Sequence, residues 1–292
     1  MSERGPKGKT LGLCALTMVA FAANSVLCRG ALAVESMGAA SFTAWRVASG
    51  ALVLSLVLSL APKREGGSKA SWRGVFALLV YAFAFSVAYR SLPAGAGALI
   101  LFAAVQLTMW GASIYEGARP SARAWVGGLL AFGGLAALLW PGRQAPDLVG
   151  ALLMSAAGVA WGVYSLLGRG GSHPLGTTQG NFVRAAPVAL AVWAISLALG
   201  HADAPSSWTA RGLGLALASG ALASGLGYAL WYRVLKDLET LTAAVAQLSV
   251  PVIAALGGVL LLGEALTMRM VAASLVTLTG IGLVSTAPKG AS

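Results

Sequence analysis

The side chains best suited to chemistry in this 292-residue sequence are aromatic rings and carboxamides that fall deep inside long apolar stretches. Rings offer flat apolar surfaces and attract ammonium groups, whereas carboxamides both donate and accept hydrogen bonds. Tyr81 and Phe85 stand four residues apart and therefore share one face of a helix. Such side chains together could bind a flat, mostly uncharged solute. The candidate binding residues are Asn24, Tyr81, Phe85, Gln106, Trp110, Trp161, Tyr164, Tyr228 and Gln247.

The composition places these side chains in a membrane. Apolar residues make up 58% of the sequence and charged residues only 10%, and the mean hydropathy is +0.79. A soluble domain of this length carries far more charge. The formal net charge of +11 does not indicate a nucleic-acid partner, because the basic residues fall between long apolar runs and form no patch.

Ten nearly uncharged stretches of about 20 residues are long enough to cross a bilayer. None alternates with a period of two, so helices are expected and barrel strands are not. The sequence therefore predicts an all-α integral membrane protein with ten transmembrane helices. The expected spans are residues 11–28, 40–61, 72–92, 94–115, 122–141, 148–167, 177–200, 213–234, 241–263 and 270–286.

Basic residues between the spans indicate the orientation. With the N-terminus inside, thirteen of the twenty Lys and Arg residues fall on the cytoplasmic side, five fall on the other side, and Arg46 and Arg184 lie within spans. Positive residues are retained on the cytoplasmic side, so both termini are expected in the cytoplasm and the protein in a bacterial inner membrane. The alternative for the first span is a cleaved signal peptide, since Ala20-Phe21-Ala22 has the form of a cleavage site.

An internal repeat divides the chain into two halves of five spans. The pairs Tyr89-Arg90 and Gln106-Leu107 of the first half recur in the same order in the second half, as Tyr232-Arg233 and Gln247-Leu248. Because five is odd, the halves are inverted, an architecture typical of secondary transporters with a substrate site near the midplane. The predicted organisation is a cytoplasmic tail 1–10, a first repeat 11–141, a linker 142–147, a second repeat 148–287 and a cytoplasmic tail 288–292.

Several short motifs stand in matching order in the two halves. They are Phe21-Ala22-Ala23-Asn24, Ala160-Trp161-Gly162, the segments around Arg46 and Arg184, the Gln-Leu-Ser-Val-Pro run of residues 247–251, and Gly263-Glu264. Together they resemble the drug/metabolite transporter superfamily, and their order is similar to that of its EamA-like ten-helix members. Within these, the chain most resembles the YddG-type aromatic amino-acid exporters. The resemblance implies export of aromatic and other neutral amino acids by alternating access. One departure is that Trp110 in the first half corresponds to Pro251 in the second.

Several positions inside the spans allow more than one interpretation. Pro187 and Pro251 each remove a backbone donor and act either as hinges or as tolerated kinks. Arg46 and Arg184 are expected to face the bundle interior or water, where they snorkel, bond carbonyl groups near a helix start or bind a substrate carboxylate. Gln106 and Gln247 contact solute or bond between helices. Deep aromatic residues line a cavity or pack, and Tyr89 and Tyr232 are expected in the interfacial belt.

Groups for other chemistry are missing from the spans. All nine acidic residues fall in tails, loops or span ends, and the two histidines, His173 and His201, fall in loops. There is no HExxH motif and no Walker A loop, so an intramembrane enzyme is a remote alternative and no cofactor or metal is expected. Without a midplane carboxylate a proton relay is disfavoured, and facilitative transport is expected.

The expected partners are a small-molecule substrate and the lipid bilayer. A two-half chain encloses its own axis, so a monomer is sufficient, and the sequence leaves the oligomeric state open. Other small metabolites or organic cations are the alternative substrates.

Overall fold

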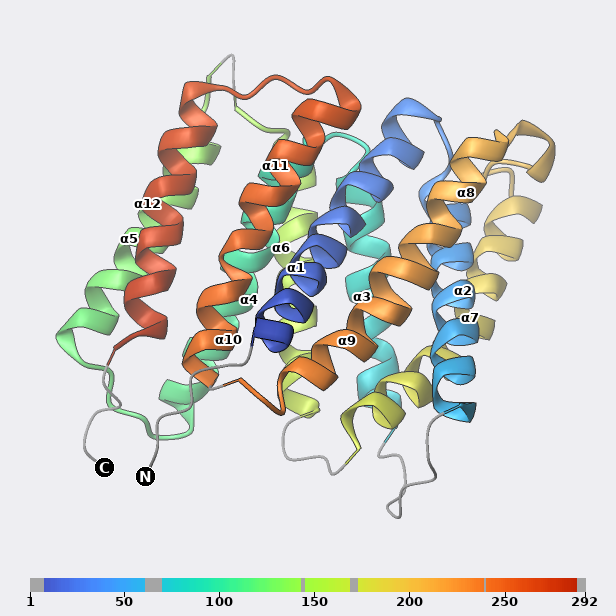
Figure 1. The fold of residues 1–292 in the computed structure, drawn as a ribbon. Coiled ribbons are helices and arrows are strands. Elements are labelled where there is room, and N and C mark those ends of the chain that lie inside the picture. Colours follow the sequence, from blue (N-terminus) through green and yellow to red (C-terminus); the bar gives the residue numbers. More distant parts are fainter. Residues whose placement is uncertain (1–7, 61–69, 143–144, 169–172, 239, 288–292) are drawn as a thin grey trace.

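The computed structural model describes residues 8–60, 70–142, 145–168, 173–238 and 240–287, and every regular element among them is a helix (Figure 1). Among these residues, nine helical stretches are long and apolar enough to cross a bilayer, and the shorter apolar helix Trp72–Ala88 is a tenth. The predicted all-α fold with ten transmembrane helices is confirmed. Of the predicted tails and linker, residues 1–7, 143–144 and 288–292 lie outside the described residues.

The ten spans follow the chain in two sets of five. The first set comprises α1 (Gly8–Arg29) with its π-helical continuation η1 (Gly30–Val34), α2 (Ala39–Ser59), α3 (Trp72–Ala88), α4 (Ala94–Tyr115) and α5 (Ala122–Leu139). The second set comprises α6 (Leu148–Leu167), α7 (Pro174–Ala198), α8 (Ala210–Ala218) with η3 (Ser219–Leu226) and α9 (Gly227–Val234), α10 (Thr240–Gln247) with α11 (Ser249–Leu262), and α12 (Met268–Ser285).

Polar N-cap residues fix where five of these helices begin. Each cap side chain accepts a hydrogen bond from the backbone N–H three residues further on, which stabilises a helix start by about 1 kcal/mol. The apolar stretches therefore begin their helices at defined points near the membrane surface. The caps are Ser71, Ser121, Asp147, Thr209 and Thr267.

The eighth span is not a uniform α-helix. It begins at Ala210 and changes to the π-helix η3 between α8 and α9. In this segment Gly220 packs so close to α2 that a Cβ atom there would meet the backbone carbonyl of Arg46. The small residue thus allows two helix backbones to touch, as is common between membrane helices.

The ninth span is broken at Leu248, between α10 and α11. Pro251 lies in the first turn of α11 and has no N–H to donate to the Gln247 carbonyl four residues back. The missing bond explains why the helix restarts at this point. Gln247 therefore ends a separate eight-residue helix.

The two sets of helices make equivalent contacts. Helix α4 packs on α6, and its counterpart α11 packs on α1 (Figure 1). Helix α2 packs on its counterpart α7, and α5 packs on its counterpart α12. Five spans precede α6, so α6 crosses in the opposite direction to α1. This pairing is the pattern expected of inverted repeats, while the repeat boundaries at 11–141 and 148–287 stay a prediction.

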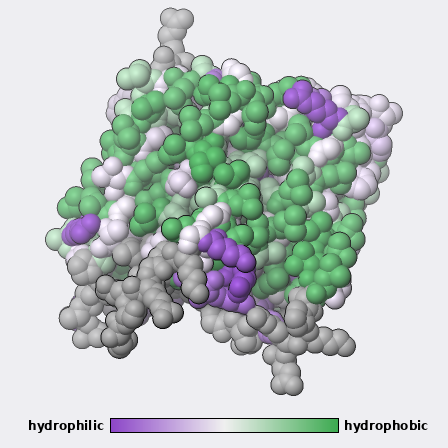
Figure 2. All heavy atoms as spheres, in the orientation of Figure 1, coloured by the Kyte–Doolittle hydropathy of each residue, from purple (hydrophilic) through white to green (hydrophobic). Residues whose placement is uncertain are grey.

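The outer surface of the bundle is apolar. Figure 2 shows hydrophobic residues over most of the visible face, with hydrophilic residues gathered near its ends. Large side chains point outward along this surface, among them Phe76, Leu260 and Leu261. Contiguous apolar surface on this scale fits a lipid environment and not water.

Candidate functional site

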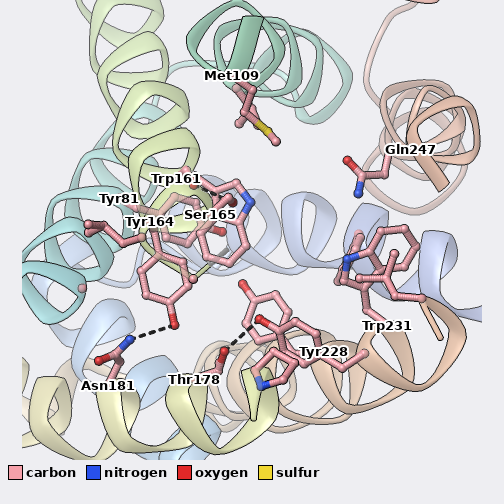
Figure 3. A pocket seen from close by; sticks show the side chains of 18 of the residues that line it. Tyr81, Met109, Trp161, Tyr164, Ser165, Thr178, Asn181, Tyr228, Trp231 and Gln247 are labelled. Carbon is pink, nitrogen blue, oxygen red and sulfur yellow. Dashed lines mark hydrogen bonds between the residues drawn. The ribbon is translucent and has the colours of Figure 1, made fainter. Parts of the chain in front are cut away.

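A cavity of about 640 Å³ lies between the two halves, lined by residues of α1, α3, α4, α6, α7, α9 and α10 (Figure 3). Its volume is in the range of small-molecule binding sites. The structure brings eight of the nine predicted binding residues to this cavity. They are Asn24, Tyr81, Phe85, Gln106, Trp161, Tyr164, Tyr228 and Gln247.

The cavity extends to one end of the bundle. Its lining includes Gly74 near the start of α3, Pro174 at the start of α7, Gly168 just after α6 and Lys236 just after α9. All four positions lie at the same end, because α3 and α7 begin where α6 and α9 stop. We call this the open end.

The opposite end, which we call the closed end, is held by a cluster around an ion pair. The Arg29 Nε atom lies 3.0 Å from Oε1 of Glu264, joining α1 to the segment after α11. Arg29 Nη1 also donates to the carbonyl oxygens of Tyr89 and Arg90 at 3.0 and 2.9 Å. Glu264 Oε2 accepts from the Ala94 N–H at 2.8 Å. We call these five residues the latch.

Four aromatic rings form one wall of the cavity. The Trp161 ring is stacked with Tyr164 and with Tyr228, with centroid separations of 5.1 and 5.3 Å and interplanar angles of 19° in both cases. The Tyr81 ring lies 4.8 Å from Trp161 at a 45° tilt. Trp161 is thus fixed in place at the centre of the wall, and Gln247 stands across the cavity from it (Figure 3).

A hydrogen-bonded chain joins the cavity lining to the buried Arg46. The buried Arg46 donates from Nη2 to the Tyr81 hydroxyl at 2.7 Å, and Asn24 donates to the same oxygen at 3.3 Å. Ser219 in turn donates to the Asn24 carbonyl oxygen at 2.6 Å. The chain joins α1, α2, α3 and η3, so both halves of the protein position Tyr81.

The wall formed by α7 was missed by sequence reasoning. Thr178 lies 2.9 Å from the Tyr232 hydroxyl, and Asn181 donates to the Tyr164 hydroxyl at 3.3 Å (Figure 3). Thr178 and Asn181 stand three residues apart, a helical spacing that places both on one face. This spacing of polar residues in an apolar span could have indicated the wall. Other lining residues outside the prediction include Phe21, Met109, Ser165 and Trp231.

The prediction that Trp110 lines the cavity is wrong. Its ring packs edge-on against Trp125 at 5.2 Å and covers Gly128, which joins α4 to α5. Met109 faces the cavity instead. One residue along a helix turns the side chain by about 100°, which is enough to move Trp110 off the cavity face.

Two further expectations about the spans are wrong. Tyr89 is not in the interfacial belt but fully buried, with its hydroxyl donating to the Ala94 carbonyl. Tyr232 lines the cavity. Arg184, for which either the bundle interior or water was expected, is exposed on α7. Each case depends on helix rotation, which the apolar pattern of a span does not specify.

The two prolines lie away from the cavity lining. Pro187 is exposed within α7, which continues through it, and Pro251 is buried in the first turn of α11. Only Pro251 coincides with a break in a helix. A hinge role for either residue stays a prediction.

The charge of the cavity lining is basic. Lys236, at the open end, is the only charged residue among the described residues that line the cavity. Within the described ranges, no group of three or more His, Cys, Asp or Glu residues is placed to hold a metal ion. The site therefore acts through rings, hydroxyls and carboxamides.

A bundle of ten apolar helices with a cavity between its two halves defines a multi-pass membrane protein. The model of the EamA-like transporter family matches residues 148–286. The threonine/homoserine exporter RhtA of Salmonella typhimurium is 30% identical over 271 residues, which cover 86% of this chain and 84% of that protein. The chain belongs to the EamA-like transporter family.

Two other similarities extend over nearly the whole chain. An uncharacterized protein of Pseudomonas aeruginosa is 51% identical over 279 residues, covering 96% of this chain and 95% of the relative. A solved crystal structure with 18% sequence identity superposes with a TM-score of 0.63 and covers 97% of both chains. The second similarity concerns the fold alone.

Proposed function

We propose that this protein exports neutral amino acids, both aromatic and small ones, across the bacterial inner membrane by alternating access. The observation that carries the proposal is the central cavity, which lies between the two halves, reaches one end of the bundle and is shut from the other by the latch. Alternate closure of the two ends would move a bound solute without opening a continuous pore.

The lining suits a small solute with both apolar and polar groups. The rings of Trp161 and Tyr164 offer a broad apolar surface, and Gln106 and Gln247 offer donors and acceptors. The similarity to the threonine/homoserine exporter supports small neutral amino acids as substrates. The aromatic wall and the resemblance to aromatic amino-acid exporters support larger ones.

The open end lies on the side from which an exporter would load its solute. The open end lies on the side of the α1 start and the α12 end, which the distribution of basic residues assigns to the cytoplasm. The structure therefore corresponds to a state that loads solute from the cell interior.

Organic cations are the second candidate class, because the aromatic wall could attract them. The charged groups at the cavity are basic, however, with Lys236 at its mouth and Arg46 behind its wall. A net positive solute would be repelled by both groups, so neutral amino acids are the better match.

Counterflow uptake into proteoliposomes tests the proposal. Vesicles holding the purified protein are preloaded with unlabelled amino acid and offered labelled threonine, homoserine, phenylalanine or tryptophan, with and without a proton gradient. Uptake that needs the protein and the matching internal amino acid supports the proposal. Absence of uptake for every amino acid, in vesicles shown to contain folded protein, contradicts it.

Two tryptophan variants connect transport to the cavity. Trp161→Leu removes the centre of the aromatic wall and is expected to weaken amino-acid binding by about 10-fold. Trp125→Leu is the matched control, because this ring packs on Trp110 outside the cavity. Equal effects of the two substitutions would show that the cavity is not the binding site.

A further inference from the structure

A buried positive charge stands behind the aromatic wall of the cavity. The Arg46 side chain is 2% exposed and lies about 10 Å along α2 from the first residue of that helix. In the part of the chain that the structure describes, no carboxylate forms an ion pair with it. A charge inside a membrane span is costly to retain, so its position calls for a functional reason.

The groups around Arg46 offer more hydrogen-bond donors than acceptors. The Tyr81 oxygen accepts one bond from Arg46 Nη2 and another from Asn24. With both acceptor positions used, the Tyr81 hydroxyl still has its own hydrogen to donate. Arg46 Nη1 is buried without a hydrogen-bond partner among the described residues. The Tyr81 hydroxyl therefore lacks an acceptor, and near a guanidinium charge the favoured acceptor is an anion.

Tyr228 supplies another donor on the same wall. Its ring is stacked on Trp161 and lines the cavity, and none of the described residues hydrogen-bonds its hydroxyl group. The guanidinium carbon of Arg46 lies 5.1 Å from the Tyr81 ring centroid and 4.7 Å from that of Phe85. These rings separate the charge from the cavity by a single layer of side chains.

We infer that this wall binds the carboxylate of the solute, with the hydroxyl groups of Tyr81 and Tyr228 as donors and the Arg46 charge behind them. Arg46 is a positioning residue: its bond to the Tyr81 oxygen directs the phenolic hydrogen away from itself, and its charge stabilises the anion. The inference rests on the proposed function in taking the solute to be an amino acid. It adds that a free carboxylate is required for recognition.

Equilibrium binding tests this requirement independently of transport. The purified full-length protein in detergent is titrated with phenylalanine, phenylalanine amide and phenylalaninol, and with threonine, its amide and threoninol, using tryptophan fluorescence as the readout. The acid of at least one series is expected to bind at least about 10-fold more tightly than its amide and alcohol. Equal affinities within both series would overturn the inference.

Variants distinguish carboxylate recognition from a structural role. Tyr228→Phe keeps the ring stack and removes only the hydroxyl group, so the affinity ratio of acid to amide is expected to fall by about 2- to 10-fold. Arg46→Met is expected to bring the affinity ratio of acid to amide close to one, and Arg46→Lys is expected to keep part of the preference for the acid. Arg184→Met is the control, because this intramembrane arginine is exposed away from the cavity.

The acid-to-amide ratio of Tyr228→Phe separates the possible outcomes, because the amide is a net cation that Arg46 and Lys236 repel and this substitution changes no charge. A structural role for Arg46 would weaken binding of acid and amide together and leave their ratio unchanged. If Arg46→Met does not fold, Tyr228→Phe still gives the answer, and an unchanged ratio in that folded variant overturns the inference. Preferential binding of the acid without counterflow would refute the proposed export and leave the carboxylate site in place. Counterflow without preferential binding of the acid would support export and refute the carboxylate site.

Discussion

Replacing Glu264 by Gln tests whether the latch keeps the closed end shut. The Glu264 carboxylate accepts from Arg29 at 3.0 Å and from the Ala94 N–H at 2.8 Å, and the Arg29 and Glu264 side chains are only 20% and 14% exposed. A Gln side chain can keep one of these bonds, but its amide nitrogen then faces the other donor. Losing one hydrogen bond to a charged group costs about 1.5–3 kcal/mol. The equilibrium should therefore shift about 10- to 150-fold toward states with this end open.

Cys28 is a native reporter of that opening. It is fully buried and directly precedes Arg29, and Cys14 is the only other cysteine of the chain. In a Cys14→Ala background, a membrane-impermeant maleimide added to intact cells is expected to label Cys28 more than 10-fold faster when Glu264 is replaced by Gln. The rate measures the population of the opened state if opening and closing are fast relative to labelling.

The outcome that would refute the latch is unchanged labelling of Cys28 in the folded Glu264→Gln variant. Asp237→Asn is the control, because this carboxylate is exposed at the open end and far from the latch. It removes the same charge without touching Arg29. An equal rise in labelling for both substitutions would indicate a general loss of stability.

Four other substitutions have definite expected outcomes. Gly158→Ala should destabilise the protein by about 1–3 kcal/mol in thermal unfolding, because the added Cβ would lie 2.6 Å from the Leu101 carbonyl oxygen. Gly133→Ala is the control and should be neutral, because there is open space around Gly133. Pro251→Ala should allow α10 and α11 to join, so counterflow should slow while the affinity for amino acid stays constant; unchanged turnover would exclude a hinge. Ser121→Ala should cost about 1 kcal/mol of stability by removing the cap of α5, and no loss would show that cap to be dispensable.

The spans were predictable because the bilayer leaves few choices. An apolar stretch of about 20 residues has to satisfy its backbone internally, so length and hydropathy alone indicate a helix. Even the break in the ninth span is explained by one residue, Pro251. The sequence indicated a hinge or a kink at this proline, and the helix is interrupted three residues before it.

The cavity was only partly predictable, since it depends on how each helix is rotated about its axis. Trp110 and Met109 are neighbours in sequence, yet Met109 reaches the cavity and Trp110 packs on Trp125. Arg29 and Glu264 are 235 residues apart, and neither carries a motif that indicates the other. Such pairings depend on tertiary packing and not on local pattern.

The shortage of carboxylates in the cavity lining also has an energetic consequence. A membrane potential of 100 mV performs about 2.3 kcal/mol of work on each elementary charge that crosses, but a zwitterion carries no net charge, and the described lining contains no acidic group to bring a proton with it. Neither the voltage nor the proton gradient would then drive transport of the solute. Transport by such a carrier depends only on the ratio of the inside and outside concentrations of the solute. Net export then occurs only when the concentration inside the cell exceeds the concentration outside.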